Sequence, residues 1–231
     1  MTTDAKDKSS LVKKLELFRD LPSSVYESIV SGARPREFMS REVMYFAGDP
    51  IKQVLLLTEG RVKITQLSES GTEVILRLSV PGELISELAL VPGGSHSSTA
   101  QALQGSTVLT WDSATFEAAL ERFPGFRTNA KRILERRLEE FERRYCEVST
   151  ETVSPRLAHS LVRLLDQIGH KVSSHIEINV SQEALAQMTA MTSFTVCRLL
   201  TNWEEQGFVK LRREKIEIHS VSRLLSLCKY K

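Results

Sequence analysis

The amino-acid sequence predicts an α+β protein: an N-terminal antiparallel β-roll, jelly-roll-like, then a long helix, then a small C-terminal unit of helices and a β-hairpin. Three observations lead to this fold class. Short β-branched runs punctuated by glycines recur between residues 36 and 111. A narrow apolar stripe on a charged segment follows, and the chain closes with two capped helices and two short strands.

Composition and charge narrow the class of protein. The chain has 231 residues and a formal net charge of +2. Residues 154–231 hold eleven Lys and Arg against seven Asp and Glu, a basic end that suits a polyanionic partner. No apolar run is long enough to cross a bilayer, and the first ten residues lack the apolar core of a signal peptide. We therefore expect a cytoplasmic protein without a membrane partner.

The N-terminal half is expected to fold as a roll. Residues 11–31 carry apolar side chains near helical spacing and predict short helices. From 36 to 111, runs at intervals of about ten residues favour an antiparallel barrel or roll over alternating strands and helices. Gly71, within SESGTE, predicts a hairpin turn between two strands.

A long helix is expected to begin at Pro124, a residue suited to a first helical turn. Its apolar side chains alternate spacings of four and three among charged residues, the period of a coiled-coil seam. The stripe either packs on the chain's own roll or joins two copies of the chain, and its narrow width favours the second interpretation. The predicted dimer seam comprises Leu134, Leu138, Phe141, Tyr145 and Val148.

The C-terminal part predicts a winged helix-turn-helix. After a strand at 175–180, Ser181 is placed to cap a helix over 182–188, and Thr192 to cap a second helix. Apolar side chains at i, i+3, i+4 and i+7 give the second helix an inward face. Two short strands, FVKLR and KIEIH, then form the wing. Such a second helix can enter a DNA major groove.

The outward face of the second helix suits contact with double-stranded DNA. Arg198 can donate two hydrogen bonds to guanine. Phe194 either touches a thymine methyl or the sugar backbone, or folds back on the first helix. The predicted DNA contacts are Ser193, Phe194, Thr195, Cys197 and Arg198 on the helix and Lys210, Arg212, Arg213 and Lys215 on the wing.

Enzymatic and metal chemistry are not indicated. The sequence shows no nucleophile–base–acid grouping, phosphate-binding loop or metal-ligand spacing. Cys146, Cys197 and Cys228 match no zinc pattern or disulfide framework and are interpreted as reduced structural thiols. We expect a protein that is not an enzyme and has no metal site.

Taken together, these segments resemble the Crp/Fnr family of bacterial transcription regulators. The resemblance is carried by YFAGD (45–49), VLLLTEGRVKI (54–64), PGELISELAL (81–90) and SQEALAQMTAMTSFTVCRLLTNWEEQGFVKL (181–211), and covers roughly residues 11–225. It implies a sequence-specific DNA-binding regulator that binds a palindromic operator as a homodimer, contacts RNA polymerase and is switched by a signal in the roll. Its three parts would be a sensor roll with short N-terminal helices (1–115), a dimerisation helix with a hinge (116–150) and a winged helix-turn-helix (151–231).

The effector pocket that the resemblance implies comprises Gly82, Glu83, Ser86, Glu87, Ser97, Ser98 and Thr99. In cyclic-AMP-binding members an Arg-Ser pair neutralises the cyclic phosphate, and the matching pair here is Ser97-Ser98. A buried phosphate without a cation is poorly compensated, so we expect an effector or redox signal other than cyclic AMP. A cyclic-nucleotide sensor with an atypical Ser-rich phosphate site remains the alternative.

Cofactors and base preference are expected to depart from familiar members. Members with an iron–sulfur cluster use an N-terminal cysteine group, and no cysteine here precedes Cys146. His96 lies where a haem ligand is conceivable, but a surface-loop histidine is more often solvated, so the cofactor is unknown. Many members carry E-x-x-S-R in the recognition helix. Here Phe194 and Cys197 replace the Glu and Ser while Arg198 is retained, and Cys197 is a structural thiol or a redox-tunable contact.

Overall fold

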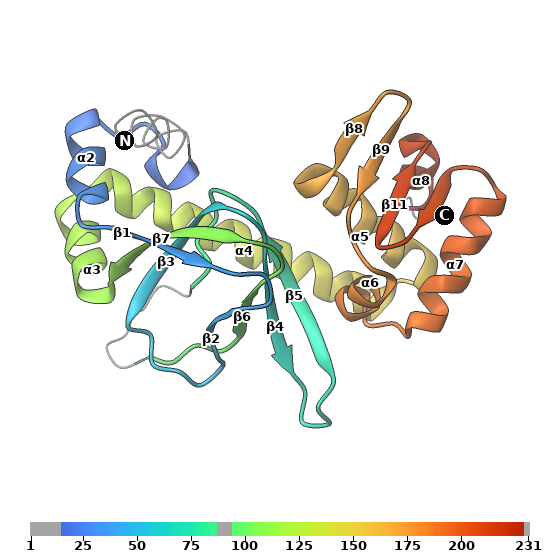
Figure 1. Ribbon diagram of the computed structural model, residues 1–231, viewed down its shortest axis with the longest axis horizontal. Coiled ribbons are helices and arrows are strands. Elements are labelled where there is room, and N and C mark those ends of the chain that lie inside the picture. Colours follow the sequence, from blue (N-terminus) through green and yellow to red (C-terminus); the bar gives the residue numbers. More distant parts are fainter. Residues whose placement is uncertain (1–14, 87–93, 229–231) are drawn as a thin grey trace. The chain divides into compact units, whose positions relative to one another are not determined.

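The computed structural model describes residues 15–86 and 94–228 (Figure 1). The described residues fall into two compact units. The first contains those up to Gln66 together with Leu76–Glu140, and the second contains Leu67–Ile75 and those from Phe141 onward. Among the described residues, no helix is long and apolar enough to span a membrane.

The first unit begins with helices, as predicted for the described part of residues 11–31: a 3-10 helix η1 (Glu16–Phe18) and α2 (Ser23–Val30). The strands that follow are β1 (Arg34–Phe38), β2 (Val43–Tyr45), β3 (Gln53–Glu59), β4 (Val62–Leu67), β5 (Glu73–Ser79), β6 (Thr99–Ala102) and β7 (Ser106–Asp112). They form two sheets, ordered β1-β7-β3 and β2-β6-β4-β5, and β7 pairs antiparallel with both β1 and β3. The antiparallel roll is confirmed.

The predicted hairpin turn at Gly71 is also confirmed. Gly71 has a φ of +80°, a left-handed conformation that glycine adopts without steric cost. Its amide donates to the carbonyl oxygen of Ser68 at 2.9 Å, and the Ser68 amide donates to the carbonyl oxygen of Thr72 at the same distance. These two bonds close the turn between β4 and β5.

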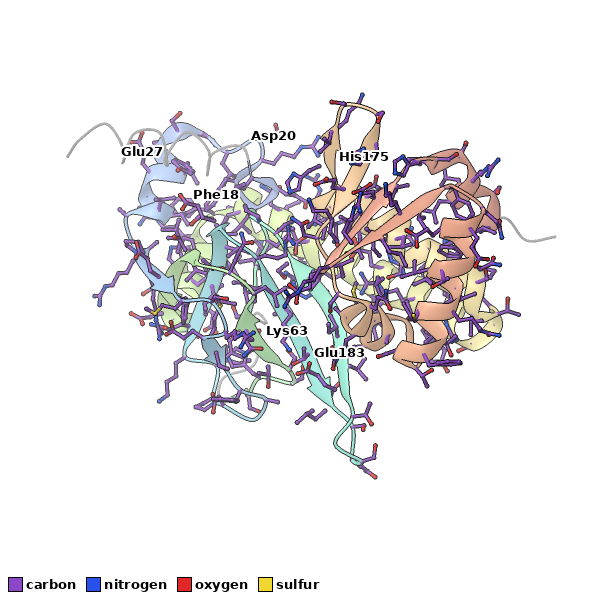
Figure 2. All side chains as sticks on the ribbon, turned by 45° about the vertical axis from the view of Figure 1, so that its right-hand side comes forward. Phe18, Asp20, Glu27, Lys63, His175 and Glu183 are labelled. Carbon is purple, nitrogen blue, oxygen red and sulfur yellow. The ribbon has the colours of Figure 1, made fainter. Side chains whose placement is uncertain are left out.

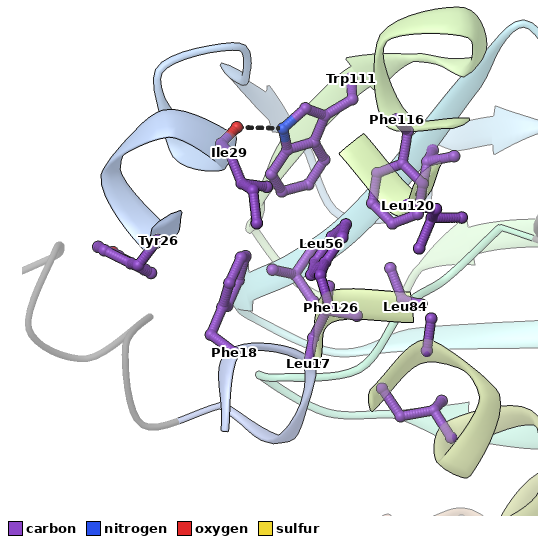
Figure 3. Close-up of a cluster of buried hydrophobic side chains, with 13 residues drawn as sticks. Leu17, Phe18, Tyr26, Ile29, Leu56, Leu84, Trp111, Phe116, Leu120 and Phe126 are labelled. Atoms are coloured by element: carbon purple, nitrogen blue, oxygen red, sulfur yellow. Dashed lines mark hydrogen bonds between the residues drawn. The ribbon is translucent and has the colours of Figure 1, made fainter. Parts of the chain in front are cut away.

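Strand β3 contributes to two separate hydrophobic cores. Its alternate residues Leu55 and Leu57 lie in the cluster between the sheets, as the two-residue period of a strand requires. Val54 and Leu56 face the opposite way, into a cluster with side chains from the helices. Figure 3 shows this second cluster, in which the Trp111 indole donates a hydrogen bond to the carbonyl oxygen of Ile29 at 2.8 Å.

Two helices complete the first unit and lead out of it. These are α3 (Ser113–Arg122) and α4 (Pro124–Thr150), so the predicted helix start at Pro124 is confirmed. The Asn129 side chain of α4 donates to the carbonyl oxygens of Leu17 at 3.2 Å and Arg19 at 2.7 Å. These bonds fasten the first turns of α4 to the N-terminal segment.

The second unit contains α5 (Val153–Ile168), β8 (His170–Val172), β9 (His175–Ile178), α6 (Gln182–Thr189), α7 (Ser193–Glu205), β10 (Val209–Arg212), β11 (Lys215–Ile218) and α8 (Val221–Leu227). Its sheet is ordered β10-β11-β9-β8. The strand predicted over 175–180 is shorter, and β8 was not predicted at all. β8 is exposed along its whole length, so it lacks the apolar alternation from which a strand can be recognised.

Replacing the buried Phe126 tests the helix-facing core. Its ring stacks on Phe18 at 5.8 Å between centroids and lies 5.2 Å from Phe116. We expect Phe126→Ala to lower the free energy of unfolding by about 3–5 kcal/mol, because it opens a cavity in a closed core. Urea unfolding followed by Trp111 fluorescence, in a Trp203→Phe background, measures the change.

The matched control for this substitution is Phe46→Ala. Phe46 is 58% exposed, so its removal opens no cavity and should change the free energy of unfolding by less than about 0.5 kcal/mol. Equal shifts of the urea midpoint in the two variants would contradict the core assignment.

Candidate functional site

A side-chain cap stabilises the N-terminus of each of the helices α6 and α7. Ser181 Oγ accepts a hydrogen bond from the Ala184 amide at 3.1 Å, and Thr192 Oγ1 accepts one from the Thr195 amide at 3.1 Å. Both predicted caps are confirmed. Ala190, in the left-handed region with a φ of +52°, makes the short turn between the helices.

The inward face of α7 is apolar and buried. Val196 and Leu200 are inaccessible to solvent and Trp203 is 2% exposed, which confirms three positions of the predicted inward stripe. The fourth, Leu199, is half-buried. The Trp203 ring lies 5.6 Å from that of Phe208, just before β10. Gly207, with a φ of +76°, lets the chain reverse from α7 into that strand. This packing leaves the first turns of α7 facing solvent.

The outward face of α7 carries the residues predicted to contact DNA. Ser193, Cys197 and Arg198 are exposed, and Thr195 is half-buried beside the cap. Phe194 is 77% exposed, so the alternative in which it folds back on the first helix is wrong. A large aromatic side chain at the N-terminal turn of this helix is available to a partner.

The wing cations fall into two groups. Arg212 Nε donates to Glu217 Oε1 at 2.9 Å, and Lys215 Nζ donates to Glu177 Oε2 at 2.6 Å. These hydrogen bonds hold the pKa of both carboxyls below the ordinary value, Glu217 chiefly through Arg212 and Glu177 chiefly through Lys215. The other wing cations are exposed on the hairpin: Lys210 and Arg213.

The predicted dimer seam lies along one exposed line of α4. Leu138 is 59% exposed, Phe141 62%, Tyr145 66% and Val148 43%, while Leu134 is half-buried. Four of the five side chains are therefore not buried by the chain itself. Large apolar groups in a row on a surface helix are characteristic of an interaction face.

The residues of the implied effector pocket lie in the loop after β5 and around the start of β6. Ser86 is buried, and its Oγ accepts a hydrogen bond from the Leu55 amide at 3.0 Å. Thr99 Oγ1 accepts one from the Ala47 amide at 3.1 Å. Gly82 has a φ of +100°, Ser97 is exposed and Ser98 is buried. Glu87 lies outside the described residues.

The same loop is held by two arginines that the sequence reasoning missed. Arg77 Nη2 donates to the carbonyl oxygen of Ile85 at 2.8 Å, and its Nη1 lies 3.7 Å from Glu83 Oε2. Arg137, on α4, donates to the carbonyl oxygen of Leu84. Burial raises the pKa of Glu83 and lowers that of Arg137 to about 10. Arg77 interrupts the apolar run EVILRLSV, and this interruption is the one local sequence signal of its role. The sequence around Arg137 carries no such signal.

His96 is buried, so the expectation of a solvated loop histidine is wrong. It is 5% exposed, and its ring stacks on Tyr45 at 3.6 Å between centroids with an interplanar angle of 11°. Tyr45 Oη in turn donates to the carbonyl oxygen of Ile85 at 3.0 Å. This stack connects the β2 strand to the same loop.

The three cysteines are free thiols in different surroundings. Cys146 and Cys197 are exposed, which does not fit a packing role in the core. Burial raises the pKa of Cys228 to about 11, and the nearby Glu151 and Glu147 add to the rise. A thiol with so high a pKa holds little thiolate at neutral pH and reacts slowly.

Comparison with known proteins covers both parts of the chain. Residues 35–123 match the family model described as a cyclic nucleotide-binding domain, and residues 155–227 match the Crp-like helix-turn-helix domain. The chain is 26% identical over 214 residues to the cyclic AMP receptor protein of Thermus thermophilus, covering 92% of this chain and 96% of the relative. It is 26% identical over 204 residues to the global nitrogen regulator of a Nostoc species, covering 85% and 92%.

Solved structures show the same fold. FixK2 from Bradyrhizobium japonicum matches with a TM-score of 0.76 at 20% identity, covering 86% of this chain and 98% of that one. A Crp/Fnr-family transcriptional regulator from Thermus thermophilus matches with a TM-score of 0.73 at 21% identity, covering 84% and 98%. With a cyclic nucleotide-binding domain match and a Crp-like helix-turn-helix match in one chain, and with a relative aligned over 92% of this chain, the protein belongs to the Crp/Fnr family of DNA-binding transcription regulators.

Proposed function

We propose that the protein regulates transcription in the cytoplasm as a homodimer that reads a palindromic operator, contacts RNA polymerase and responds to a signal other than cyclic AMP. It performs no enzymatic step. Residues 1–115 form the sensor, 116–150 the dimerisation helix with its hinge, and 151–231 the DNA-binding domain. The observation that carries the proposal is the exposed N-terminal half of α7, which presents Arg198 to a partner while its opposite face is buried.

Recognition of bases would depend chiefly on Arg198. A guanidinium at this position of a recognition helix can donate to both O6 and N7 of a guanine in the major groove. Ser193 and Thr195, at the N-terminal turn, suit phosphate oxygens, and the helix dipole favours negative charge there. The Phe194 side chain has no hydrogen-bonding group and is 77% exposed to solvent, so it suits an apolar contact with the methyl group of a thymine.

The wing would supply contacts that position the domain without reading sequence. Lys210 and Arg213 are exposed and suit flanking phosphates. Arg212 and Lys215 are engaged with carboxylates and must exchange those bonds for phosphate oxygens. We infer that the first pair contributes more to DNA affinity than the second, because a new contact that breaks an existing ion pair yields less net free energy.

Arg198→Ala tests base recognition on DNA fragments selected from a random-sequence pool by the wild-type protein. We expect about a 10- to 100-fold loss of affinity for the selected site and a relaxed preference at one base pair in each half-site, because a bidentate contact is lost. Titration monitored by fluorescence anisotropy measures the affinity, and repeated selection with the variant measures the preference.

The control for this variant is Thr201→Ala, at an exposed position later on the same helix. It should bind the selected site as tightly as the wild-type protein. Unchanged affinity and unchanged base preference in Arg198→Ala would refute the assignment of α7 as the reading element.

Dimerisation would bury the exposed line of α4 against a second copy. Each of these side chains removes apolar area from water on pairing, and the spacings of four and three keep them on one side of two supercoiled helices. Mixed charges flank the line, including Arg136, which already bonds Glu16 at 2.8 Å. An antiparallel or parallel partner of the same sequence fits both the apolar line and the mixed charge.

Leu138→Asp should convert the protein from dimer to monomer, because the substitution places a charge in the middle of the apolar contact. Sedimentation velocity gives the mass of the species in solution. The control is Leu67→Asp, at a 67% exposed leucine at the end of β4, which should leave the dimer intact. A Leu138→Asp protein that sediments as a dimer would remove the seam assignment.

The effector is proposed to lack the cyclic phosphate of cyclic AMP. The position that carries the neutralising arginine in cyclic-AMP-binding members is Ser97 here. The two arginines that hold this loop, Arg77 on β5 and Arg137 on α4, donate to its backbone carbonyl oxygens. Ser86 and Thr99 use their hydroxyl groups to hold backbone amides. A phosphate entering this region would have to displace several of these bonds.

A second candidate, a cyclic-nucleotide sensor that uses Ser98 and its neighbours, is favoured by the cyclic nucleotide-binding domain match over 35–123. Calorimetric titration with cyclic AMP separates the two. We expect no saturable heat at cyclic AMP concentrations up to about 1 mM. A Kd weaker than about 1 mM corresponds to a binding free energy smaller than about 4 kcal/mol. Saturable binding that disappears in Ser98→Ala but persists in Ser95→Ala, an exposed neighbour, would establish the second candidate instead.

A further inference from the structure

The sheet of the DNA-binding domain has one polar face on which two histidines and a glutamate converge. His175 belongs to β9 (Figure 2), Glu217 to β11, and His219 directly follows β11. One potential ligand atom from each of these three side chains lies within 4.8 Å of the other two. The three side chains are only partly accessible: His175 is 17% exposed, Glu217 11% and His219 36%.

The convergence follows from strand register. Ile176 pairs with Ile218. Ile178, Ile216 and Ile218 are buried and Ile176 is half-buried, so these side chains lie on the inward face of the sheet. Because side chains alternate across a strand, the neighbouring residues point to the opposite face. His175 and His219 are thereby brought together across the two strands, and their rings lie 5.1 Å apart between centroids at an angle of 29°.

Ion pairs orient the two carboxylates on this face. Glu217 Oε1 receives the hydrogen bond from Arg212, so its other oxygen, Oε2, is turned toward His219 Nε2 at 3.4 Å. Beside it, Glu177 Oε1 lies 3.4 Å from His175 Nε2 while its Oε2 is held by Lys215. Two imidazoles therefore lie against two carboxylates, each of which has one oxygen fixed by a cation and one directed at a ring.

We propose that His175, Glu217 and His219 form a binding site for a divalent transition-metal ion of the zinc class. Two imidazole nitrogens and one carboxylate oxygen are donors that zinc accepts, whereas magnesium and calcium require mostly oxygen ligands. Ligand atoms about 2.0–2.2 Å from a tetrahedral zinc ion are about 3.4 Å apart, so small side-chain rotations close the present cluster around the ion. The partial exposure of His219 leaves the fourth position open to water, with Glu177 next to the site.

The charges around the site determine how tightly we expect it to bind a metal ion. Arg212 and Lys215 already balance the two carboxylates, so a bound dication adds uncompensated positive charge. We therefore expect binding in the micromolar range rather than the tighter range of closed structural zinc sites. None of the three proposed ligands belongs to α7, and the test of the site requires no DNA.

Calorimetric titration of the full chain, without a purification tag, with Zn²⁺ tests the proposal, and Co²⁺ absorption reports the ligand field. We expect one ion per chain, a cobalt spectrum of a four-coordinate site and no heat with Mg²⁺. His175→Gln, His219→Gln and Glu217→Gln should each weaken Zn²⁺ binding by about 10-fold or more. The matched control is His170→Gln, an exposed histidine on β8 of the same sheet, which should bind as the wild-type protein does.

Two results would overturn the site: absence of stoichiometric Zn²⁺ binding by the wild-type chain, or equal loss in His170→Gln and His219→Gln. Circular dichroism of each variant establishes that the domain is folded. Glu177→Gln is a further variant. A loss as large as that in Glu217→Gln would make Glu177 the fourth ligand and retain the site, while unchanged binding would leave the three-residue site as proposed.

Discussion

The burial of one face of α7 is the constraint on which the DNA-binding surface depends. Val196, Leu200 and Trp203 recur at helical spacing and are removed from solvent, each contributing about 1.5–3 kcal/mol relative to an exposed side chain. The orientation of the helix is thus determined by its core, and the outward direction of Arg198 follows from geometry. Residues on the outward face can change, as Phe194 and Cys197 do, without altering how the helix is held.

In the roll, hydrogen bonds from two arginines add to the apolar packing that connects the loop after β5 with α4. Arg77 and Arg137 reach the same short loop from β5 and α4, and both donate to its backbone carbonyls while Glu83 lies between them. Tyr45, stacked on His96, donates to the same stretch. A displacement of this loop would change the hydrogen bond from Arg137 on α4, so the signal proposed for the roll would have a contiguous physical route to that helix.

Local sequence patterns predict the structural features whose stability depends on residues close together in the chain. The caps Ser181 and Thr192, the turn at Gly71 and the start of α4 at Pro124 depend on neighbouring residues and were predicted correctly. The buried position of His96, the roles of Arg77 and Arg137, and the cluster of His175, Glu217 and His219 depend on strand register and on residues far apart in sequence. The sequence spacing of 175, 217 and 219 resembles no metal-ligand motif. The cluster arises only when β9 pairs with β11.

The exposed line on α4 also bears on gene dosage. In the proposed dimer a second copy completes this surface, and the DNA-competent species is then second order in chain concentration. At levels below the dimer dissociation constant, operator occupancy would rise with the square of the amount of protein made. A twofold change in synthesis would then alter occupancy about fourfold, so the cell could set the threshold of the response through expression as well as through the roll.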